Sequence, residues 1–125
     1  TCSDGDGDVR PDRWSMPGGT LGRVIHLYLH ARALPGARPA VESFLAEARA
    51  VYEELDGVAV RLQWSTTDPD AFVEIMEYAD ESTWRRDQER VEHDPRMRAL
   101  IERWHGLLAS GPVVSTYEDV PITVP

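Results

Sequence analysis

The chain has 125 residues, 42% of them hydrophobic, and a formal net charge of −9. This length suits one domain with its own apolar core, and the acidic balance argues against nucleic acid or a membrane surface as a partner, because both attract basic faces. No run of about 18 apolar residues occurs, so we expect no membrane span and place the protein in the cytoplasm.

Residues 1–21 are rich in Gly, Pro and Asp, and they are expected to form an irregular arm. The folded domain is expected to cover residues 22–120, followed by a short tail at 121–125. Its first element is a strand, Arg23–Ala31. In this strand apolar residues alternate with polar and aromatic ones, which is typical of a half-buried strand.

A helix is predicted next, because Pro39 suits a first turn and apolar residues then recur with helical spacing up to Leu55. Gly57 is the expected stop of this helix. A second strand, Val58–Ser65, follows, and the polar residues 66–70 form a hairpin turn.

The third predicted strand is Phe72–Tyr78, after which Asp80 or Ser82 can cap a second helix. The pair Asp94-Pro95 should interrupt this helix, because Pro95 has no N–H and clashes with the preceding turn. Asp94 can cap the new start, and the helix is expected to end at Gly111-Pro112. A fourth strand, Val113–Val120, closes the domain.

The order β-α-β-β-α-β predicts an α+β, ferredoxin-like domain with a four-stranded antiparallel sheet and helices on one face only. The opposite face is expected to be aromatic and apolar, so a second copy should cover it and make a homodimer. The residues assigned to this face are His26, Tyr28, His30, Arg61, Gln63, Phe72, Glu74, Met76, Tyr78, Ser115 and Tyr117.

Over about residues 22–120 the chain resembles the dimeric α/β-barrel superfamily, and most of all its antibiotic-biosynthesis-monooxygenase-like branch. The residues that carry the resemblance are the Phe44/Leu45 helix ending at Leu55-Asp56-Gly57, the stretch Glu74-Ile75-Met76-Glu77-Tyr78, Trp84, the break His93-Asp94-Pro95, Trp104 and the strand Val113–Val120. The resemblance implies face-to-face pairing of two sheets and a cavity in each protomer. It also implies, from some members, cofactor-free oxygenation of phenolic polyketides.

Other members of this family degrade haem with an Asn on the first strand, a Trp and a helix His. The first strand here has no Asn, and His93 lies about a turn after the position of the family's His. This departure argues against haem cleavage, and no metal or other cofactor is expected. His26 and His30 cannot share a metal ion on a strand, because four residues span about 13 Å.

His26, His30 and Glu74 are the predicted catalytic residues. If the central strands pair with their centres aligned, Tyr28 lies near Glu74, and the carboxylate could orient a histidine as a general base. A hydrogen-bonded dimer interface is the alternative. The predicted substrate-binding residues are Tyr28, Arg61, Met76, Tyr78, Trp84 and Tyr117.

Two functions remain open from the sequence. One is a small cofactor-independent monooxygenase-like oxidoreductase, or a related enzyme, that acts on an aromatic or polyketide-like small molecule in a pocket lined by His and Tyr. The other is a non-catalytic dimeric ligand-binding or stress-associated protein. A closed cavity of at least about 300 Å³ at His26, Tyr28, His30 or Glu74 would favour the enzyme.

Overall fold

Residues 23–122 are described by the computed structural model, so the predicted arm at residues 1–21 lies outside the described part of the chain. The elements in order are β1 (Ile25–Ala33), α1 (Arg38–Tyr52), β2 (Val58–Trp64), β3 (Ala71–Tyr78), α2 (Glu81–His93), α3 (Pro95–His105) and β4 (Leu108–Glu118). No helix in this part of the chain is both long and apolar enough to cross a membrane.

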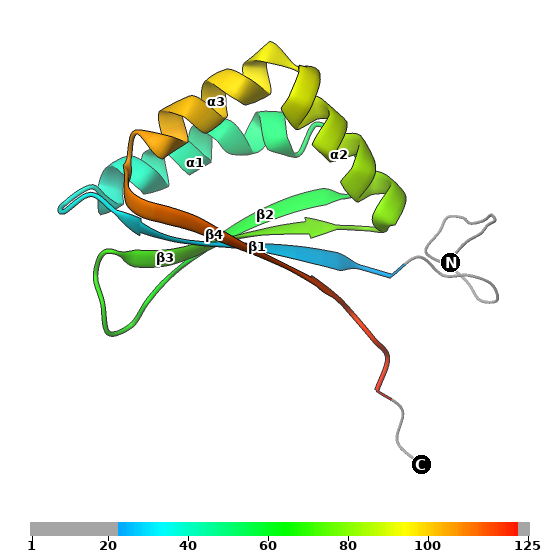
Figure 1. Cartoon of the computed structure of the whole chain (residues 1–125), viewed down its shortest axis with the longest axis horizontal. Helices are drawn as coiled ribbons and strands as arrows, with labels where there is room; N and C mark the ends of the chain where they lie inside the picture. Colours follow the sequence, from blue (N-terminus) through cyan, green and yellow to red (C-terminus); the bar gives the residue numbers. More distant parts are fainter. Residues whose placement is uncertain (1–22, 123–125) are drawn as a thin grey trace.

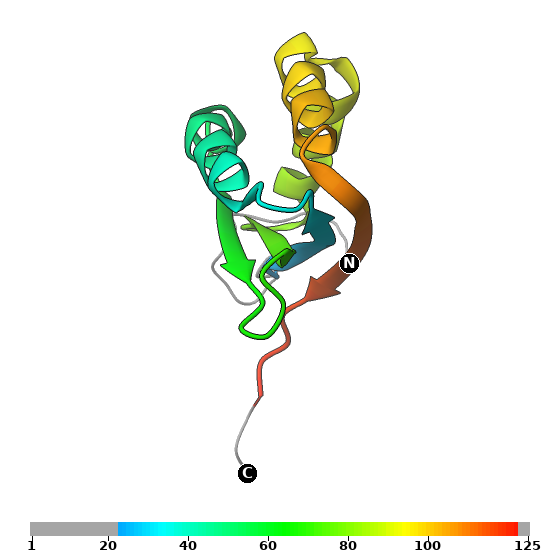
Figure 2. The same ribbon diagram turned by 90° about the vertical axis from the view of Figure 1, so that its left-hand side faces the viewer.

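The four strands form one antiparallel sheet in the order β2-β3-β1-β4. The three helices of residues 23–122 lie on the same side of this sheet, and no helix from these residues covers its other side (Figure 1). Viewed from the end, α1 and α3 lie side by side above the strands (Figure 2). The predicted ferredoxin-like α+β fold is therefore confirmed, with the second helix divided into α2 and α3.

The core fills the space between the helices and the sheet. It is made of apolar side chains from every element, and α1 contributes the spaced set predicted from its sequence. The largest buried contributors are Phe44, Tyr52, Phe72, Met76, Tyr78, Met97, Leu100 and Trp104.

The break between α2 and α3 falls where the sequence predicts it. The Asp94 side chain accepts a hydrogen bond from the Arg96 backbone N–H at 2.9 Å, and Pro95 occupies the first turn of α3. Asp80 caps α2 in the same way, since it accepts from the Thr83 N–H at 2.8 Å. Local capping chemistry therefore fixes both helix starts.

The ends of helices α1 and α3 differ most from the prediction. Helix α1 ends at Tyr52, and the segment 53–57 forms a turn that enters β2 through Gly57 at φ 92°. Helix α3 ends at His105, so Gly111 and Pro112 lie within β4, which begins at Leu108. Gly111 has φ 93°, and an added Cβ would lie 2.8 Å from the His30 carbonyl oxygen. This close approach of β4 to β1 therefore requires glycine.

The pairing of β1 with β3 corrects the predicted sheet faces. Glu74 lies opposite Leu29, and Tyr28 lies opposite Ile75, one residue away from the centred alignment. Because side chains alternate along a strand, this single step moves every β3 residue to the other face. Phe72, Glu74, Met76 and Tyr78 therefore face the helices, and the prediction that placed them on the helix-free face is wrong.

The helix-free face of the sheet, called the open face below, is defined by this register. Its side chains are those of His26, Tyr28, His30, Arg61, Gln63, Val73, Ile75, Glu77, Val113, Ser115 and Tyr117. Aromatic and branched apolar side chains dominate it.

Candidate functional site

The sheet separates the nine residues predicted from the sequence as site residues into two groups. Those on the open face are His26, Tyr28, His30, Arg61 and Tyr117, and those on the helix side are Glu74, Met76, Tyr78 and Trp84. The predicted pairing of a β1 histidine with Glu74 is therefore wrong, because the backbone of the sheet lies between the two side chains.

The open-face group forms an aromatic row along β1. The ring of Tyr28 lies between those of His26 and His30, with ring centroids 6.1 and 6.4 Å apart. Tyr117 from β4 meets Tyr28 edge-on at 5.4 Å. The carboxylate nearest to His26 belongs to Asp119, whose Oδ1 lies 3.2 Å from Nε2 of His26.

On the helix side, Glu74 is a buried acid at the centre of the sheet. Only 4% of the residue is exposed, and among residues 23–122 its carboxyl group has no hydrogen bond or ion pair. Burial alone raises the pKa of Glu74 to about 7, because the ionised form loses its hydration. At neutral pH the carboxylic acid and the carboxylate forms of Glu74 are therefore both populated.

A second buried acid, Asp87, faces the sheet from α2. Its Oδ2 accepts a hydrogen bond from the Tyr78 hydroxyl at 2.7 Å, and Arg90 Nη1 lies 3.4 Å from its Oδ1. Burial raises the pKa of Asp87, whereas the Tyr78 hydrogen bond and the Arg90 charge act in the opposite direction. The Tyr78 hydroxyl is thereby held in one orientation.

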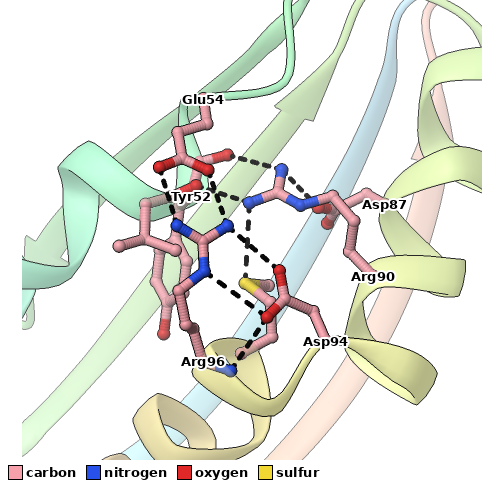
Figure 3. A network of polar contacts seen from close by, with 8 residues as sticks. Tyr52, Glu54, Asp87, Arg90, Asp94 and Arg96 are labelled. Atoms are coloured by element: carbon pink, nitrogen blue, oxygen red, sulfur yellow. Dashed lines mark hydrogen bonds and ion pairs between the residues drawn. The ribbon is translucent and has the colours of Figure 1, made fainter.

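Arg90 joins α2 to the end of α1 and to α3 (Figure 3). It forms an ion pair with Asp87, donates to the backbone carbonyls of Val51 and Tyr52 at the end of α1, and contacts the Met97 sulfur at 3.6 Å. Figure 3 also shows Arg96 bridging Glu54 and Asp94, which ties the end of α1 to the start of α3. This network fixes the position of α2 over the sheet.

Tyr52 connects the two acids electrostatically. Burial raises the pKa of its hydroxyl, and the charges of Glu74 and Asp87 both raise it further. The same two acids also raise the pKa of Tyr78. These four buried side chains of the helix side, Tyr52, Glu74, Tyr78 and Asp87, are called the interior acid cluster below.

Two indole groups add unused hydrogen-bond donors to the helix side. The Nε1 atoms of Trp84 and Trp104 are buried, and neither has a partner within the described residues. Trp104 packs edge-on against Phe72 with ring centroids 6.3 Å apart, and Phe72 is two residues before Glu74 on the same face. Both indole groups therefore lie on the same side of the sheet as Glu74.

The interior acid cluster also includes residues that the sequence did not indicate as functional. Asp87 lies in a highly charged stretch of α2, a pattern that usually indicates a solvated helix face, but it is only 2% exposed. The spacing of Thr83, Asp87 and Val91 by four residues marks the inward stripe of α2, and this signal could have found it.

A surface groove of about 420 Å³ lies between α1 and α3. It is lined by Ala40, Ser43, Phe44, Glu47, Arg103, Gly106 and Leu107. Arg103 spans the helices to Glu47 at 2.8 and 3.0 Å, and its guanidinium lies over the Phe44 ring. None of the nine predicted residues lines this groove, although Phe44 reaches from it into the core.

Comparison with known proteins finds similarity in structure alone. No protein-family model and no curated protein matches the sequence. Among solved structures, a candidate antibiotic biosynthesis monooxygenase from Caulobacter crescentus CB15 aligns at a TM-score of 0.67 and 16% identity, over 80% of this chain and 92% of that one. The chain has the fold of the antibiotic-biosynthesis-monooxygenase-like proteins.

Two further structures support the same fold. A candidate antibiotic biosynthesis monooxygenase from Chloroflexus aurantiacus J-10-fl aligns at a TM-score of 0.61 and 19% identity, over 81% of this chain and 97% of that one. A variant of SnoaB, a cofactor-independent oxygenase from Streptomyces nogalater, aligns at 0.61 and 15% identity, over 81% and 95%. The predicted resemblance is confirmed at the level of fold.

Proposed function

We propose that the protein is a small cofactor-independent oxygenase that acts on a hydroxyaromatic molecule at the interior acid cluster. The observation that carries this proposal is Glu74, a buried carboxyl group without a partner in residues 23–122 and with a pKa of about 7. A general base is most effective when its pKa lies near the working pH. The names of the structural neighbours support oxygen as the co-reactant.

In the proposed reaction, ionised Glu74 removes a proton from a CH₂ group made acidic by a neighbouring hydroxyaromatic ring. The resulting carbanion reduces O₂ and forms a bond to oxygen. Overall, CH₂ becomes C=O, and one oxygen atom enters the product. The second oxygen leaves as water with the two hydrogens from carbon, so the substrate supplies all four electrons.

The other residues of the helix side have binding roles in this proposal. Tyr78, held by Asp87, offers a fixed hydroxyl oxygen, and the indole N–H groups of Trp84 and Trp104 can donate to a carbonyl or developing oxyanion. Met76 is buried beside Glu74 on β3 and supplies apolar contact. The β1 histidines have no chemical role here.

We also propose that a second copy covers the open face. Tyr28, Val113 and Tyr117 form an aromatic and apolar surface on a sheet face that no helix of the described chain covers. In this arrangement His26, His30 and Arg61 supply polar contacts at a homodimer interface.

Oxygen uptake tests the proposed chemistry. Metal-free protein would be mixed with a dihydroxyanthrone, and the rate above autoxidation would be measured for the wild type, Glu74→Gln and Glu77→Gln. Glu77 is the matched control, because it lies on the same strand but faces the open side. We expect Glu74→Gln alone to lose about 10²-fold or more in rate. Equal rates in all three proteins would refute the assignment of Glu74.

A non-catalytic ligand-binding role is the second candidate. It is favoured by the tight packing around Glu74, which is 4% exposed, and by the position of the α1–α3 groove away from it. Saturable binding of hydroxyaromatics without oxygen uptake would support this role and exclude the oxygenase.

A further inference from the structure

Helix α2 is attached to the rest of the domain differently from the other two helices. Its buried side chains are those of Thr83 and Asp87, which are polar, and its apolar residues Trp84 and Val91 are only partly buried. The side chains that α1 and α3 bury are all apolar or aromatic. Because burial of an apolar face is the main force that holds a helix on a sheet, α2 is held by it less firmly than α1 or α3.

Polar contacts of two residues join α2 to its neighbours instead. Asp87 accepts the hydrogen bond from the Tyr78 hydroxyl of β3 at 2.7 Å. Arg90 donates to the backbone carbonyls of Val51 and Tyr52 at the end of α1. These bonds are called the latch below. Since each involves a charged group, the loss of one should shift an opening equilibrium by about tenfold or more.

The two ends of α2 are marked by residues with extended backbone. Asp80 precedes the helix at φ −161° and ψ 176°, and Asp94 separates it from α3 at φ −90° and ψ 116°. Pro95 has no N–H with which to continue the hydrogen bonding of α2 into α3. The chain changes direction sharply at this break (Figure 1). Helix α2 can therefore leave the sheet without unwinding α3.

The residues beneath the helices are closed off from water. Only 4% of Glu74, 2% of Asp87 and 1% of Tyr78 is exposed, and none of the three lines the groove between α1 and α3. A ligand can reach these side chains only if an element of the domain moves. Helix α2 is bonded to Tyr78 directly, so its departure would uncover this part of the sheet.

We propose that α2 is a lid, which opens as one unit between Asp80 and Asp94 while α1, α3 and the sheet stay folded. The latch holds the lid closed, and its opening gives a hydroxyaromatic molecule access to the interior acid cluster. This role in ligand entry rests on the proposed function, whereas the opening itself is a property of the free protein.

Amide hydrogen exchange of the full-length protein without ligand measures the opening. The hydrogen-bonded amides of α2 should exchange together, about 10²-fold or more faster than the slowest amides of β1 and β3, which become exposed only on global unfolding. The slowest amides of α1 and α3 should stay within about tenfold of those of the sheet. Amides of α2 as slow as those of the sheet, or amides of α3 as fast as those of α2, would overturn the inference.

Two variants test the latch by the same measurement. Arg90→Met removes the bonds to α1, and Arg85→Met is the matched control, because Arg85 lies on the same helix and pairs with Glu81 at the surface. Exchange in α2 should become about tenfold or more faster in Arg90→Met and change less than about threefold in Arg85→Met. Equal effects would refute the latch. If Arg90→Met does not fold, Tyr78→Phe replaces it with the same expectation, because it removes the other latch bond.

Oxygen uptake separates the lid from the proposed chemistry. Faster exchange of α2 in a protein that takes up no oxygen would leave the lid standing and would refute the oxygenase alone. Oxygen uptake with α2 as slow as the sheet would refute the lid alone.

Discussion

At the scale of single residues, the carboxyl group of Glu74 is the most unusual group in the described chain. Its pKa is raised to about 7 in the folded protein, above its ordinary value of 4.5. Between these two values the unfolded chain releases its proton more readily than the folded one. The free energy of unfolding should therefore fall as the pH rises from about 4.5 to about 7, and then level off.

Glu74→Gln should remove this pH dependence. At about 1.4 kcal/mol for each pKa unit, the variant should be more stable than the wild type at pH 8 by up to about 3 kcal/mol, and the difference should be small near pH 5. Urea unfolding at the two pH values measures it. Glu77→Gln should show no comparable gain, and a gain of the same size in both variants would contradict the burial argument.

The bond between Tyr78 and Asp87 gives a second prediction at this scale. Tyr78→Phe removes the 2.7 Å hydrogen bond and leaves a buried carboxyl less satisfied, which should cost about 1–3 kcal/mol of the free energy of unfolding. Tyr117→Phe is the control, since Tyr117 is 61% exposed on the open face. Chemical denaturation measures the free energy of unfolding of both variants. Equal losses would show that the buried Tyr78–Asp87 hydrogen bond does not stabilise the fold.

The site residues could be predicted from the sequence only in part. The alternation of β3 correctly groups Glu74 with Phe72, Met76 and Tyr78, but both faces of this strand are apolar, so the pattern cannot decide which face meets the helices. The pairing register decides it, and a shift of one residue reverses the answer. Asp87 was missed because a charged residue on a helix usually faces water.

At the scale of secondary-structure elements, local chemistry predicted the helix starts well. Asp80, Asp94 and Pro95 act through bonds within a few residues, so their roles are visible in the sequence. The sequence did not predict the start of β4 at Leu108, because a Gly-Pro pair such as Gly111-Pro112 usually ends a secondary-structure element. Here this pair lies inside a strand whose pairing with β1 shifts register between His30 and Ala33.

Gly111 gives a prediction for the β1–β4 pairing. Gly111→Ala should destabilise the protein more than Gly36→Ala, although both glycines have positive φ. An added Cβ at Gly36 meets nothing within 4 Å, so backbone strain of about 1–2 kcal/mol is the whole cost. At Gly111 it also collides with the backbone of His30 and Ala31. Thermal unfolding of both variants measures the two losses of stability. Equal losses would mean that the close approach of β4 to β1 adds nothing to the cost of a Cβ at Gly111.

At the scale of the whole molecule, the open face predicts a homodimer of about twice the 14.1 kDa chain mass. Val113→Asp places a charge on this face at a residue that is 67% exposed in the single chain, so it should weaken association without unfolding the domain. Leu34→Asp, in the turn before α1, is the control. Light scattering at micromolar concentration measures the mass.

A charge at Met76 would not serve this purpose. The register places Met76 in the core beneath the helices, so a charge there should unfold the domain itself.

In the light-scattering experiment, two results would exclude the open face as the dimer interface. One is a wild-type protein with the mass of a monomer, and the other is a Leu34→Asp variant that dissociates as readily as Val113→Asp.

The central claim is that chemistry occurs on the helix side of the sheet, at Glu74, and not at the histidines of the open face. The most direct test compares kcat/KM for oxygen uptake in Glu74→Gln, His26→Ala and His30→Ala with the same hydroxyaromatic substrate. We predict a loss of about 10²-fold or more for Glu74→Gln and changes of only a few-fold for the two histidine variants. A 10²-fold loss in either histidine variant, with Glu74→Gln near the wild-type rate, would contradict the claim.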